Sequence, residues 1–568
     1  MGTARTRRLT GDSITFGYDA AGRPSSVTFD RGTLGFSFNS LTGTLTSLSA
    51  PGGLGLALTY DGSLPTSLTW SGTVAGSTQR TAYSYDSHGA LSAMLSRLGT
   101  DTLFRTSYTR DSLSRITQLI ERIGAGTDTL AFAYDSVGRL SSVSRNGSVT
   151  ASYTYDLNGN RATQVTSGGT LTATVDDQDR LLSYGTATYG YTAHGDLLWK
   201  AVGTDTTHYS YDALGNLVQV LLPDGTDIGY LIDAQNRRIG KTVNDTLVRA
   251  WLYQGQLTPV AELDGSGNVV SRFVYATGVN VPDYLVRGDS TYRLVRDHLG
   301  SVRLVVNVAT GTVAQRIDYD AFGIEVQNTN PGWQPFGYAG GLGDAQTGLV
   351  RFGARDYDPV AGRWTAKDPI GFLSGSTSLY AYASGEPVNL VDYTGSIAVA
   401  PILWGAGAGA VGGALESIAL QMLLNGCIDW SQVAIDATIG AAGGAAASAL
   451  KIWNGVRRAA QSASGAERGG LNLYKYLDPT STKASGWKEG DRFLNLPDRG
   501  SYKANWKQNA SRLREEMRSG NPIFDSYRDA RGELIPTKGF LNAERQLLEN
   551  QGWRYSSSTG AWHPRGGL

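Results

Sequence analysis

Tyr209-Ser210-Tyr211-Asp212-Ala213-Leu214-Gly215-Asn216-Leu217 is the clearest copy of a short unit that recurs along the first two thirds of the chain. The unit has the form Tyr-x-Tyr-Asp-x-x-Gly-x-Leu. Other copies carry Tyr18-Asp19, Tyr85-Asp86, Tyr134-Asp135, Tyr155-Asp156 and Tyr319-Asp320, and degenerate copies lie around Tyr108, Tyr189 and Tyr230. Neighbouring units follow at about 20 to 25 residues, so the chain contains an internal repeat.

Each unit predicts a β-hairpin. Alternating Tyr and Thr residues suit a strand with one buried face. Asp at the strand end accepts backbone hydrogen bonds, and Gly supplies the positive φ of the turn. Because a single hairpin is marginally stable, the hairpins must stack on their neighbours. A propeller blade needs about 40 residues, which is twice this period, so the repeat favours a spiralling β-sheet.

The amino-acid composition further restricts the class of protein. Gly accounts for 73 of 568 residues, Pro for only 17, and 40% of the residues are hydrophobic, which indicates a packed core and excludes collagen. The single cysteine, Cys427, excludes a disulfide scaffold and a Cys-rich zinc site.

The basic start, residues 1–8, is followed by a polar repeat rather than the apolar core of a signal peptide. We therefore expect either a chain that waits in the cytoplasm for export or a fragment of a longer protein.

The repeats resemble the YD repeats of the Rhs family of polymorphic toxins, which also includes insecticidal toxin-complex C components and teneurins. The resemblance covers roughly residues 10–395 and extends to 297–303 and to 337–395, which is similar to the Rhs-associated core. Its motifs are Asp344-Ala345-Gln346-Thr347-Gly348-Leu349, Arg355-Asp356-Tyr357-Asp358-Pro359, Gly362-Arg363-Trp364, Tyr380-Ala381-Tyr382 and Asn389-Leu390-Val391-Asp392. The resemblance implies a cocoon-like β-shell, 1–336, closed by the core, 337–395. Because family shells are usually longer, we expect a truncated member or a shell completed by another chain.

Members of this family cut themselves after an Asp-Pro-x-Gly-Leu motif, using two aspartates. The resemblance places this motif at Asp368-Pro369-Ile370-Gly371-Phe372, the cut at Phe372–Leu373 and the second aspartate at Asp344, with Asp358 as a third candidate. Two carboxylates that share a proton can activate water and protonate a carbonyl oxygen. The alternative is that these aspartates only cap turns. Phe372 replaces the usual Leu and is expected to fill the same pocket. Tyr393-Thr394-Gly395 replaces the usual Pro-x-Gly and is expected to be peripheral to the cut.

An apolar Gly/Ala-rich segment, 396–464, follows the core. Residues 397–415 carry no charge, and 434–450 carry only Asp436. Small residues allow close helix packing, whereas Gly and Ala contribute little to membrane insertion. Three interpretations stay open: a helical hairpin inside the shell, an aid to crossing the target membrane, or a pore-former.

The C-terminal region, 465–568, is more basic than the rest of the chain. Residues 471–568 carry 16 Lys and Arg against 11 Asp and Glu, a net charge of +5. Since the whole chain is neutral, residues 1–470 carry −5. A basic module behind a mildly acidic shell favours a nucleic-acid-binding toxin. Of its tryptophans, at least two are expected to belong to the core rather than to stack on bases.

The C-terminal module is predicted to be a small α+β domain. Its pattern predicts a basic helix over 505–518, a strand or turn over 523–527 and a turn over 529–532. A second helix fits 540–550, capped by Gly552, and a hairpin fits Trp553–Tyr555 with Ala561–His563. The module resembles C-terminal domains of other Rhs and contact-dependent-inhibition proteins, without an assigned activity.

Catalytic motifs in this module are weak. It contains no zinc, Walker or HNH signature, and the lack of Cys excludes zinc deamination, so no metal is expected. Metal-independent RNA cleavage needs a base, an acid and a phosphate-binding cation. The candidates for proton transfer are His563, Glu544, Asp525 and Tyr527, and those for nucleic-acid binding are Arg514, Arg528, Lys538, Arg545 and Trp506. The alternative is that His563 is a solvated C-terminal residue and that Glu544 and Arg545 belong to the solvated face of a helix.

Together these features predict an interbacterial polymorphic toxin whose shell encloses the C-terminal module and releases it by autoproteolysis. The module is expected to be a nuclease, with RNA favoured as substrate and no cofactor. Alternatives are an ADP-ribosyltransferase using NAD, with Arg492, Tyr502 and Glu544, a membrane-depolarising toxin acting through 397–450, or an inactive cassette. The family implies an immunity protein, a type VI secretion spike or adaptor, target nucleic acid and the target membrane as partners. It also implies a bacterial cytoplasmic start and delivery into target cells.

Overall fold

A computed structural model describes most of the first 399 residues and short stretches of the C-terminal region. The described ranges are 5–7, 13–21, 23–29, 32–49, 53, 55–62, 64–71, 79–275, 277–374, 376–399, 471–473, 492–493, 513–514, 517, 523–525, 534, 540–557 and 561–564. The chain divides into two units, residues 1–457 and 458–568, and each is described by itself.

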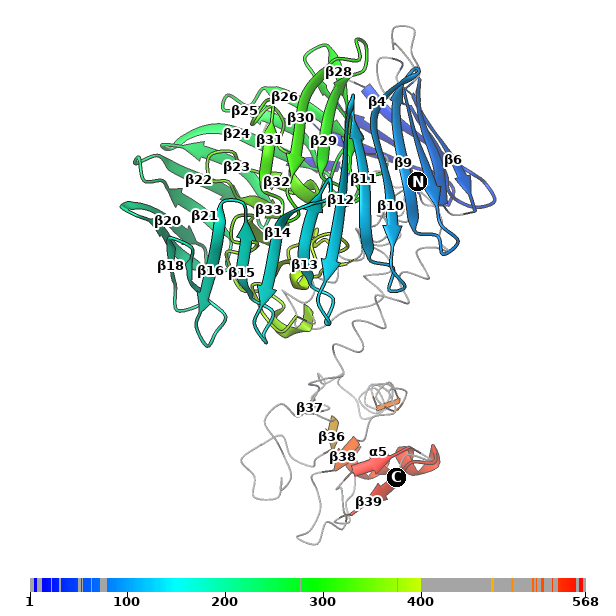
Figure 1. Ribbon diagram of the computed structural model, residues 1–568. Helices are drawn as coiled ribbons and strands as arrows, with labels where there is room; N and C mark the ends of the chain where they lie inside the picture. Colours follow the sequence, from blue (N-terminus) through cyan, green and yellow to red (C-terminus); the bar gives the residue numbers. More distant parts are fainter. Residues whose placement is uncertain are drawn as a thin grey trace. The chain divides into compact units, whose positions relative to one another are not determined.

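One long antiparallel sheet dominates the first unit (Figure 1). In the described part it has 31 strands, β1 to β31, and each strand pairs with the next one along the chain. The first sixteen strands are β1 Arg5–Arg7, β2 Ser13–Tyr18, β3 Pro24–Phe29, β4 Gly32–Phe38, β5 Leu45–Ser49, β6 Gly55–Asp61, β7 Leu64–Ser71, β8 Gln79–Tyr85, β9 Leu91–Leu98, β10 Asp101–Arg110, β11 Ile116–Ile123, β12 Gly126–Tyr134, β13 Leu140–Arg145, β14 Ser148–Tyr155, β15 Arg161–Thr166 and β16 Gly169–Val175. The others are β17 Leu181–Tyr184, β18 Ala187–Tyr191, β19 Leu197–Val202, β20 Asp205–Tyr211, β21 Leu217–Leu221, β22 Asp227–Ile232, β23 Arg238–Val243, β24 Thr246–Tyr253, β25 Pro259–Asp264, β26 Val269–Val274, β27 Tyr284–Arg287, β28 Ser290–Arg296, β29 Val302–Asn307, β30 Val313–Tyr319 and β31 Glu325–Asn328. This confirms the predicted sheet of repeated hairpins.

The turn of each repeat follows the predicted chemistry. Asp212 Oδ1 accepts the backbone N–H groups of Leu214 and Asn216, both at 2.9 Å. The Gly215 N–H donates to the Asp212 carbonyl at 3.1 Å, and Gly215 has a φ of +80°. The Asp side chain therefore closes the turn, and Gly supplies the left-handed conformation that a Cβ disfavours.

In several repeats an arginine and a tyrosine tie one hairpin to the next. Arg139 Nε donates to Asp135 Oδ2 at 2.7 Å, and its guanidinium lies 4.7 Å from the ring centroid of Tyr155. The Tyr155 hydroxyl in turn donates to the Leu140 carbonyl at 2.8 Å. Equivalent contacts join Arg115 to Tyr134 and Arg237 to Tyr253. These links supply the stacking that a marginal hairpin needs.

The sheet curls so that early strands pack against late ones. Trp70 on β7 meets Tyr284 on β27 edge to face, with ring centroids 5.2 Å apart. Arg303 on β29 donates through Nη2 to Glu121 Oε1 on β11 at 2.8 Å. One continuous apolar cluster includes buried residues from β4 through β14 and from β25 through β29. The two layers therefore share a common core.

Residues 337–395 form a compact substructure against the sheet. Its four short strands are β32 Leu342–Gly343, β33 Val350–Phe352, β34 Arg355–Asp358 and β35 Arg363–Trp364, and its 3-10 helices are η2 Tyr338–Gly340, η3 Gly371–Ser374 and η4 Tyr382–Gly385. An aromatic cluster of Tyr338, Phe352, Tyr357, Trp364 and Tyr382 fills its centre. The Tyr357 hydroxyl donates to the Phe322 carbonyl at 2.7 Å, which joins this substructure to a turn of the sheet.

The described residues of the second unit include a mixed sheet of five strands in the order β37-β36-β38-β40-β39. Its elements are β36 Leu471–Leu473, β37 Arg492–Phe493, β38 Ile523–Asp525, α5 Phe540–Asn550, β39 Arg554–Ser556 and β40 Ala561–His563. The helix has the predicted bounds, Gly552 after it has a φ of +83°, and β39 and β40 form the predicted hairpin. Trp553 and Trp562 are buried in the core, as expected of at least two tryptophans.

Most of the other C-terminal predictions lie outside the described residues. These include the apolar segment 400–464, nearly all of the helix predicted over 505–518, and the turn at 529–532. Among the helices that are described, none combines the length and apolar character needed to cross a membrane.

Candidate active site

Two aspartates of the 337–395 substructure bind the same arginine. Arg355, the first residue of β34, donates from Nη2 to Asp368 Oδ2 at 2.9 Å and to Asp392 Oδ2 at 3.3 Å. Its guanidinium also lies 4.2 Å from the ring centroid of Trp364. β34 therefore supplies the cation, and two loops each supply a carboxylate.

This cluster is almost fully buried. The exposed fractions of the side chains are 4% for Arg355, 5% for Asp368 and 3% for Asp392. Burial raises the pKa of Asp368 to about 7; the charge of Arg355 opposes this shift, and the neighbouring Asp392 adds to it. Asp368 can therefore hold or release a proton near neutral pH, as one member of a catalytic carboxyl pair must.

The chain that follows Asp392 turns back onto the same groups. Asp392 Oδ1 accepts the backbone N–H groups of Ser396 at 2.9 Å and Ile397 at 3.0 Å. Arg355 Nε donates to the Gly395 carbonyl at 2.5 Å. The peptide groups joining Gly395 to Ile397 thus contact both an acid and the guanidinium.

Close backbone packing holds this segment in place. The Ala354 N–H donates to the Thr394 carbonyl at 2.8 Å. Gly395 has a φ of +69°, and a Cβ built on it would lie only 2.4 Å from the Phe352 carbonyl oxygen. Only glycine fits there without displacing β33 and its turn.

The other two predicted aspartates have separate cationic partners. Asp344 accepts from Lys241 Nζ on Oδ1 and from the Tyr230 hydroxyl on Oδ2, both at 2.7 Å. Burial acts to raise the pKa of Asp344, but the Lys241 ammonium and these hydrogen bonds hold it below its usual value. Asp358 bonds to Lys200 Nζ at 3.2 Å and accepts the Val360 N–H at 2.9 Å. Among the described contacts, none joins Asp344 or Asp358 to Asp368.

The predicted scissile bond, Phe372–Leu373, lies in η3 just after Asp368. The Phe372 side chain is 65% exposed, so it fills no pocket, contrary to the expectation for this apolar residue. The side chain of Leu373 lies outside the described residues. The cut at this bond stays a prediction.

The structure describes only some of the C-terminal candidates. Glu544 and Arg545 on α5 and His563 on β40 are buried, whereas Arg514 is exposed. Asp525 and Arg492 lie on β38 and β37, but their side chains are outside the described part, as are Trp506, Tyr502, Tyr527, Arg528 and Lys538. Among the described residues, no group of three or more His, Cys, Asp or Glu is arranged to hold a metal ion.

Neither Asp392 nor Arg355 was among the catalytic residues predicted from the sequence. One signal was available, because Asp392-Tyr393-Thr394-Gly395 repeats the Asp-x-x-Gly spacing of Asp368-Pro369-Ile370-Gly371. The contact that Asp368 and Asp392 share with Arg355 depends on how β34 and two separate loops fold together.

The fold and the repeat chemistry agree with comparisons to known proteins. The profile of the Teneurin YD-shell family matches residues 71–384, more than half of the chain. The chain belongs to the YD-shell family. Human teneurin-4 is 30% identical over 280 residues, which are 47% of this chain and 10% of that protein. Double-stranded DNA deaminase toxin A of Burkholderia cenocepacia (strain H111) is 29% identical over 290 residues, which are 48% of this chain and 17% of that protein.

A solved structure confirms the YD-shell architecture. The crystal structure of TcdB2-TccC3-TEV aligns with a TM-score of 0.55 at 18% identity, over 68% of this chain and 21% of that chain. The chain therefore spans about a tenth to a fifth of the length of the curated relatives named above.

Proposed function

We propose that this YD-shell protein cuts its own chain, with Asp368 and Asp392 as the catalytic carboxyl pair and Arg355 as the cation between them. The observation that carries the proposal is the shared Arg355 Nη2, which holds both carboxylates next to the peptide groups of Gly395–Ile397. Burial, which raises the pKa of Asp368 to about 7, suits a proton donor at neutral pH.

The proposed reaction is the hydrolysis of one peptide bond of the chain. Asp392 takes a proton from a water molecule, and the resulting hydroxide attacks the carbonyl carbon. Asp368 protonates the carbonyl oxygen, and Arg355 stabilises the charge that develops there. When the C–N bond breaks, the proton on Asp392 passes to the leaving nitrogen, and the proton on the former carbonyl oxygen returns to Asp368, which leaves a carboxyl group and a free amine. The Gly395 carbonyl contacts Arg355 and the Ser396 N–H contacts Asp392, which supports a cut at Gly395–Ser396 or at the next bond, Ser396–Ile397.

The position of the cut tests the proposal. Purified full-length chain is incubated at neutral pH, and the intact masses of the products are measured. A C-terminal product starting at Ser396 or Ile397 supports the Asp368–Asp392 pair. A product starting at Leu373 instead supports the cut predicted at Phe372–Leu373 and the pairing of Asp368 with Asp344. An uncut chain contradicts both.

We further propose that the shell carries a toxin, residues 465–568, delivered into other cells. The net charge of +5 over 471–568 supports a nucleic-acid target. A curated relative is named a DNA deaminase toxin, which supports toxin delivery, but the C-terminal module lacks the Cys ligands that a zinc deaminase uses. Metal-independent RNA cleavage therefore remains the proposed activity, with a cognate immunity protein and an export apparatus as its partners.

Expression of residues 465–568 in bacteria, with and without the shell, tests this second proposal. Degraded RNA supports a nuclease, and ADP-ribose on intact macromolecules supports the transferase alternative. If growth arrest instead requires residues 397–450, a membrane-acting toxin is indicated.

A further inference from the structure

Ser396 carries a buried hydroxyl directly after the Gly395 carbonyl. The exposed fraction of Ser396 is 1%, and its Oγ has no hydrogen-bond partner among the described residues. A buried polar atom without a partner costs free energy, so its presence in a folded protein calls for an explanation. The hydroxyl belongs to the same residue whose N–H group donates to Asp392 Oδ1 at 2.9 Å.

The peptide bond before Ser396 has both of its ends in contact with the candidate active site. Arg355 Nε donates to the Gly395 carbonyl oxygen at 2.5 Å, where negative charge develops when the carbonyl carbon is attacked. Asp392 contacts the nitrogen at the other end of the same bond. A donor for the oxyanion and a proton carrier for the leaving nitrogen are therefore in place, and the remaining requirement is a nucleophile.

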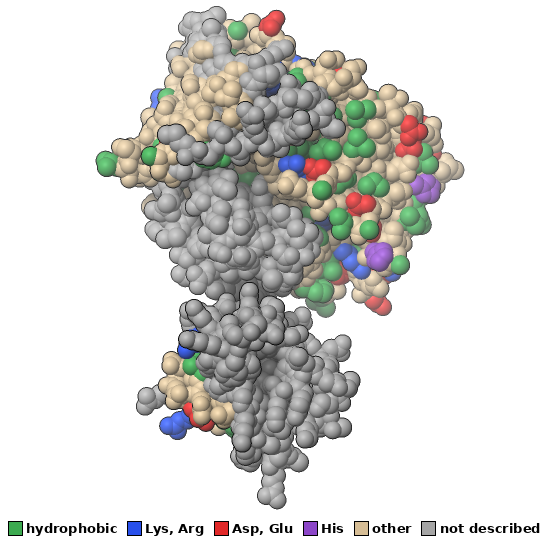
Figure 2. Space-filling view, turned by 180° about the vertical axis from the view of Figure 1, so that it is seen from behind, with side chains coloured by type: hydrophobic (Ala, Val, Ile, Leu, Met, Phe, Trp, Pro, Cys, Tyr) green, Lys and Arg blue, Asp and Glu red, His purple; other side chains and the backbone are tan. Residues whose placement is uncertain are grey.

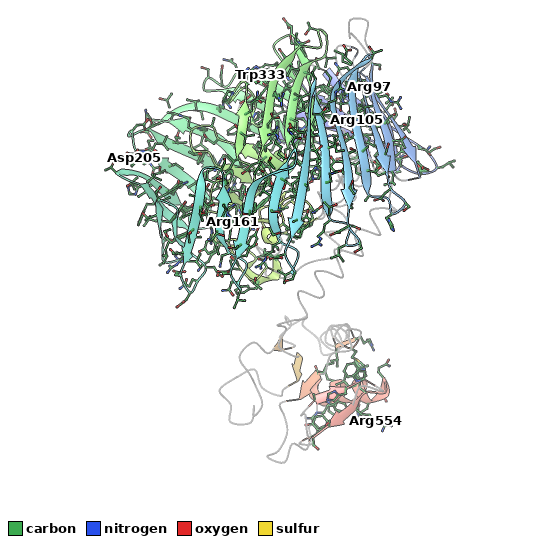
Figure 3. The ribbon with its side chains drawn as sticks, viewed as in Figure 1. Arg97, Arg105, Arg161, Asp205, Trp333 and Arg554 are labelled. Carbon is green, nitrogen blue, oxygen red and sulfur yellow. The ribbon has the colours of Figure 1, made fainter. Side chains whose placement is uncertain are left out.

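Burial restricts the access of bulk water to this bond. Asp205, at the start of β20, is an exposed acid at one end of the sheet, as Figure 3 shows. The side chain of Asp392, in contrast, is only 3% exposed, and Gly395 and Ser396 are buried. The Ser396 hydroxyl needs no path from solvent, because it is part of the residue that follows the carbonyl.

A serine hydroxyl can attack the carbonyl of the residue before it. The attack closes a ring of Oγ, Cβ, Cα, the backbone nitrogen and the carbonyl carbon. An attack on the carbonyl of the serine itself would close a smaller, strained ring, so Ser396 can act on the Gly395–Ser396 bond but not on Ser396–Ile397. A well-oriented group within the same molecule acts at an effective concentration of about 10⁵ M or more.

We propose that Ser396 is the nucleophile of the first step of self-cleavage and converts the Gly395–Ser396 peptide bond to an ester. This inference rests on the self-cleavage proposed above and names a further catalytic residue for it. Ser396 Oγ passes its proton to Asp392 and bonds to the Gly395 carbonyl carbon, while Asp368 protonates the carbonyl oxygen. When the C–N bond breaks, Asp392 gives its proton to the Ser396 nitrogen and the proton on the oxygen returns to Asp368. The product is an ester that joins the Gly395 carbonyl carbon to Ser396 Oγ.

Water then hydrolyses this ester. Asp392 takes a proton from a water molecule, and the hydroxide attacks the ester carbonyl carbon. As the C–O bond breaks, the proton on Asp392 passes to Ser396 Oγ. The products are a carboxyl group at Gly395 and a chain that starts with the free amine and hydroxyl of Ser396. Direct hydrolysis of the peptide bond gives the same products, so the ester is the species that distinguishes the two routes.

Hydroxylamine gives the direct test, because it attacks an ester much faster than a peptide bond. Purified full-length chain is incubated at neutral pH with and without hydroxylamine, and the intact masses of the products are measured. We expect faster cleavage in hydroxylamine and an N-terminal product that ends in a hydroxamic acid at Gly395.

Two outcomes of this experiment overturn the inference but leave the self-cleavage by Asp368 and Asp392 in place. One is a product that ends only in a carboxylic acid at Gly395 when hydroxylamine is present. The other is a C-terminal product that starts at Ile397. An uncut chain contradicts the proposed self-cleavage, and this inference with it.

Variants at Ser396 give the second test. Ser396→Ala removes the nucleophile, so we expect cleavage at least tenfold slower and no hydroxamic acid. Ser396→Cys keeps a nucleophile and forms a thioester, so its cleavage should be accelerated by dithiothreitol. Ser271→Ala is the matched control, since Ser271 on β26 is also 1% exposed and its hydroxyl also has no partner among the described residues. This control should be cut at the rate of the unchanged chain, and an equal rate in Ser396→Ala would contradict the inference.

Discussion

Asp368 and Asp392 lie 24 residues apart in the sequence, yet both bond to Nη2 of Arg355, at 2.9 and 3.3 Å. The contact brings together the loop after β35, the loop after η4 and the start of β34. Two acids on one buried cation next to a backbone segment form the arrangement from which self-cleavage is proposed.

Removing either acid should stop the cut. Asp368→Asn and Asp392→Asn keep the side-chain shape but remove the ionisable group, so we expect a single full-length band on a denaturing gel. Asp344→Asn should still be cut, because Asp344 bonds to Lys241 and Tyr230 instead. Circular dichroism shows whether each variant is folded. Cleavage that continues in the Asp392 variant but stops in the Asp344 variant would favour Asp344 and Asp368 as the catalytic pair.

Gly395→Ala should block cleavage without touching any ionisable group. The added Cβ would lie 2.4 Å from the Phe352 carbonyl oxygen at a φ of +69°, so the segment can no longer rest against Arg355. We expect cleavage at least tenfold slower, measured as loss of full-length chain over time. Gly371→Ala is the matched control, since Gly371 has a similar φ of +59° but a Cβ there meets no atom within 4 Å. Equal rates in the two variants would contradict the proposed position of the cut.

Cleavage should slow as the pH rises through about 7. The pKa of Asp368 is raised to about 7, and the proposed mechanism uses its protonated form. The rate should therefore fall above that pH by about tenfold per pH unit. The measurement is the initial cleavage rate between mildly acidic and alkaline pH. A rate that rises steadily with pH is incompatible with Asp368 as the proton donor.

Stability should also fall as the pH rises, in part because of Glu386. Burial raises the pKa of Glu386 to about 8 from an ordinary 4.5. Because the folded state holds this proton more tightly than the unfolded state, its stabilising effect is complete below the ordinary pKa and is lost as the pH rises toward 8. Each such group lowers the free energy of unfolding by about 1.4 kcal/mol per pH unit in that window. Urea unfolding of Glu386→Gln should give a shallower dependence on pH; an unchanged slope would contradict this.

The buried ion pair of Arg303 with Glu121 joins the early and late strands. It should contribute more to the free energy of unfolding than an exposed ion pair does. Arg303→Met leaves Glu121 buried without its cation, whereas Asp318 keeps its contact with Arg316, so we expect a loss of about 3–5 kcal/mol in the free energy of unfolding. Arg145→Met is the control, since that arginine pairs with Asp128 at 47% exposure and should cost about 1 kcal/mol or less. Similar losses in both variants would mean that the two layers do not depend on this contact.

On one face of the described residues, surface charge gives no comparable signal for a partner. On the face seen in Figure 2, acidic, basic and apolar side chains of the described residues are interspersed rather than gathered by kind.

Local pattern alone determined the hairpin repeat, its Asp–Gly turns, the helix Phe540–Asn550 and the hairpin after it. These features depend on hydrogen bonds and φ angles within a few residues, which residue type controls directly. Only the tertiary structure decided that Asp368 shares Arg355 with Asp392, that Asp344 bonds to Lys241, and that Arg303 binds both Glu121 and Asp318. These pairings join residues up to 182 positions apart, as in Arg303 with Glu121. They depend on how strongly the sheet curls before its early and late strands meet. That curvature is the accumulated twist of many strands, so no single sequence motif predicts it.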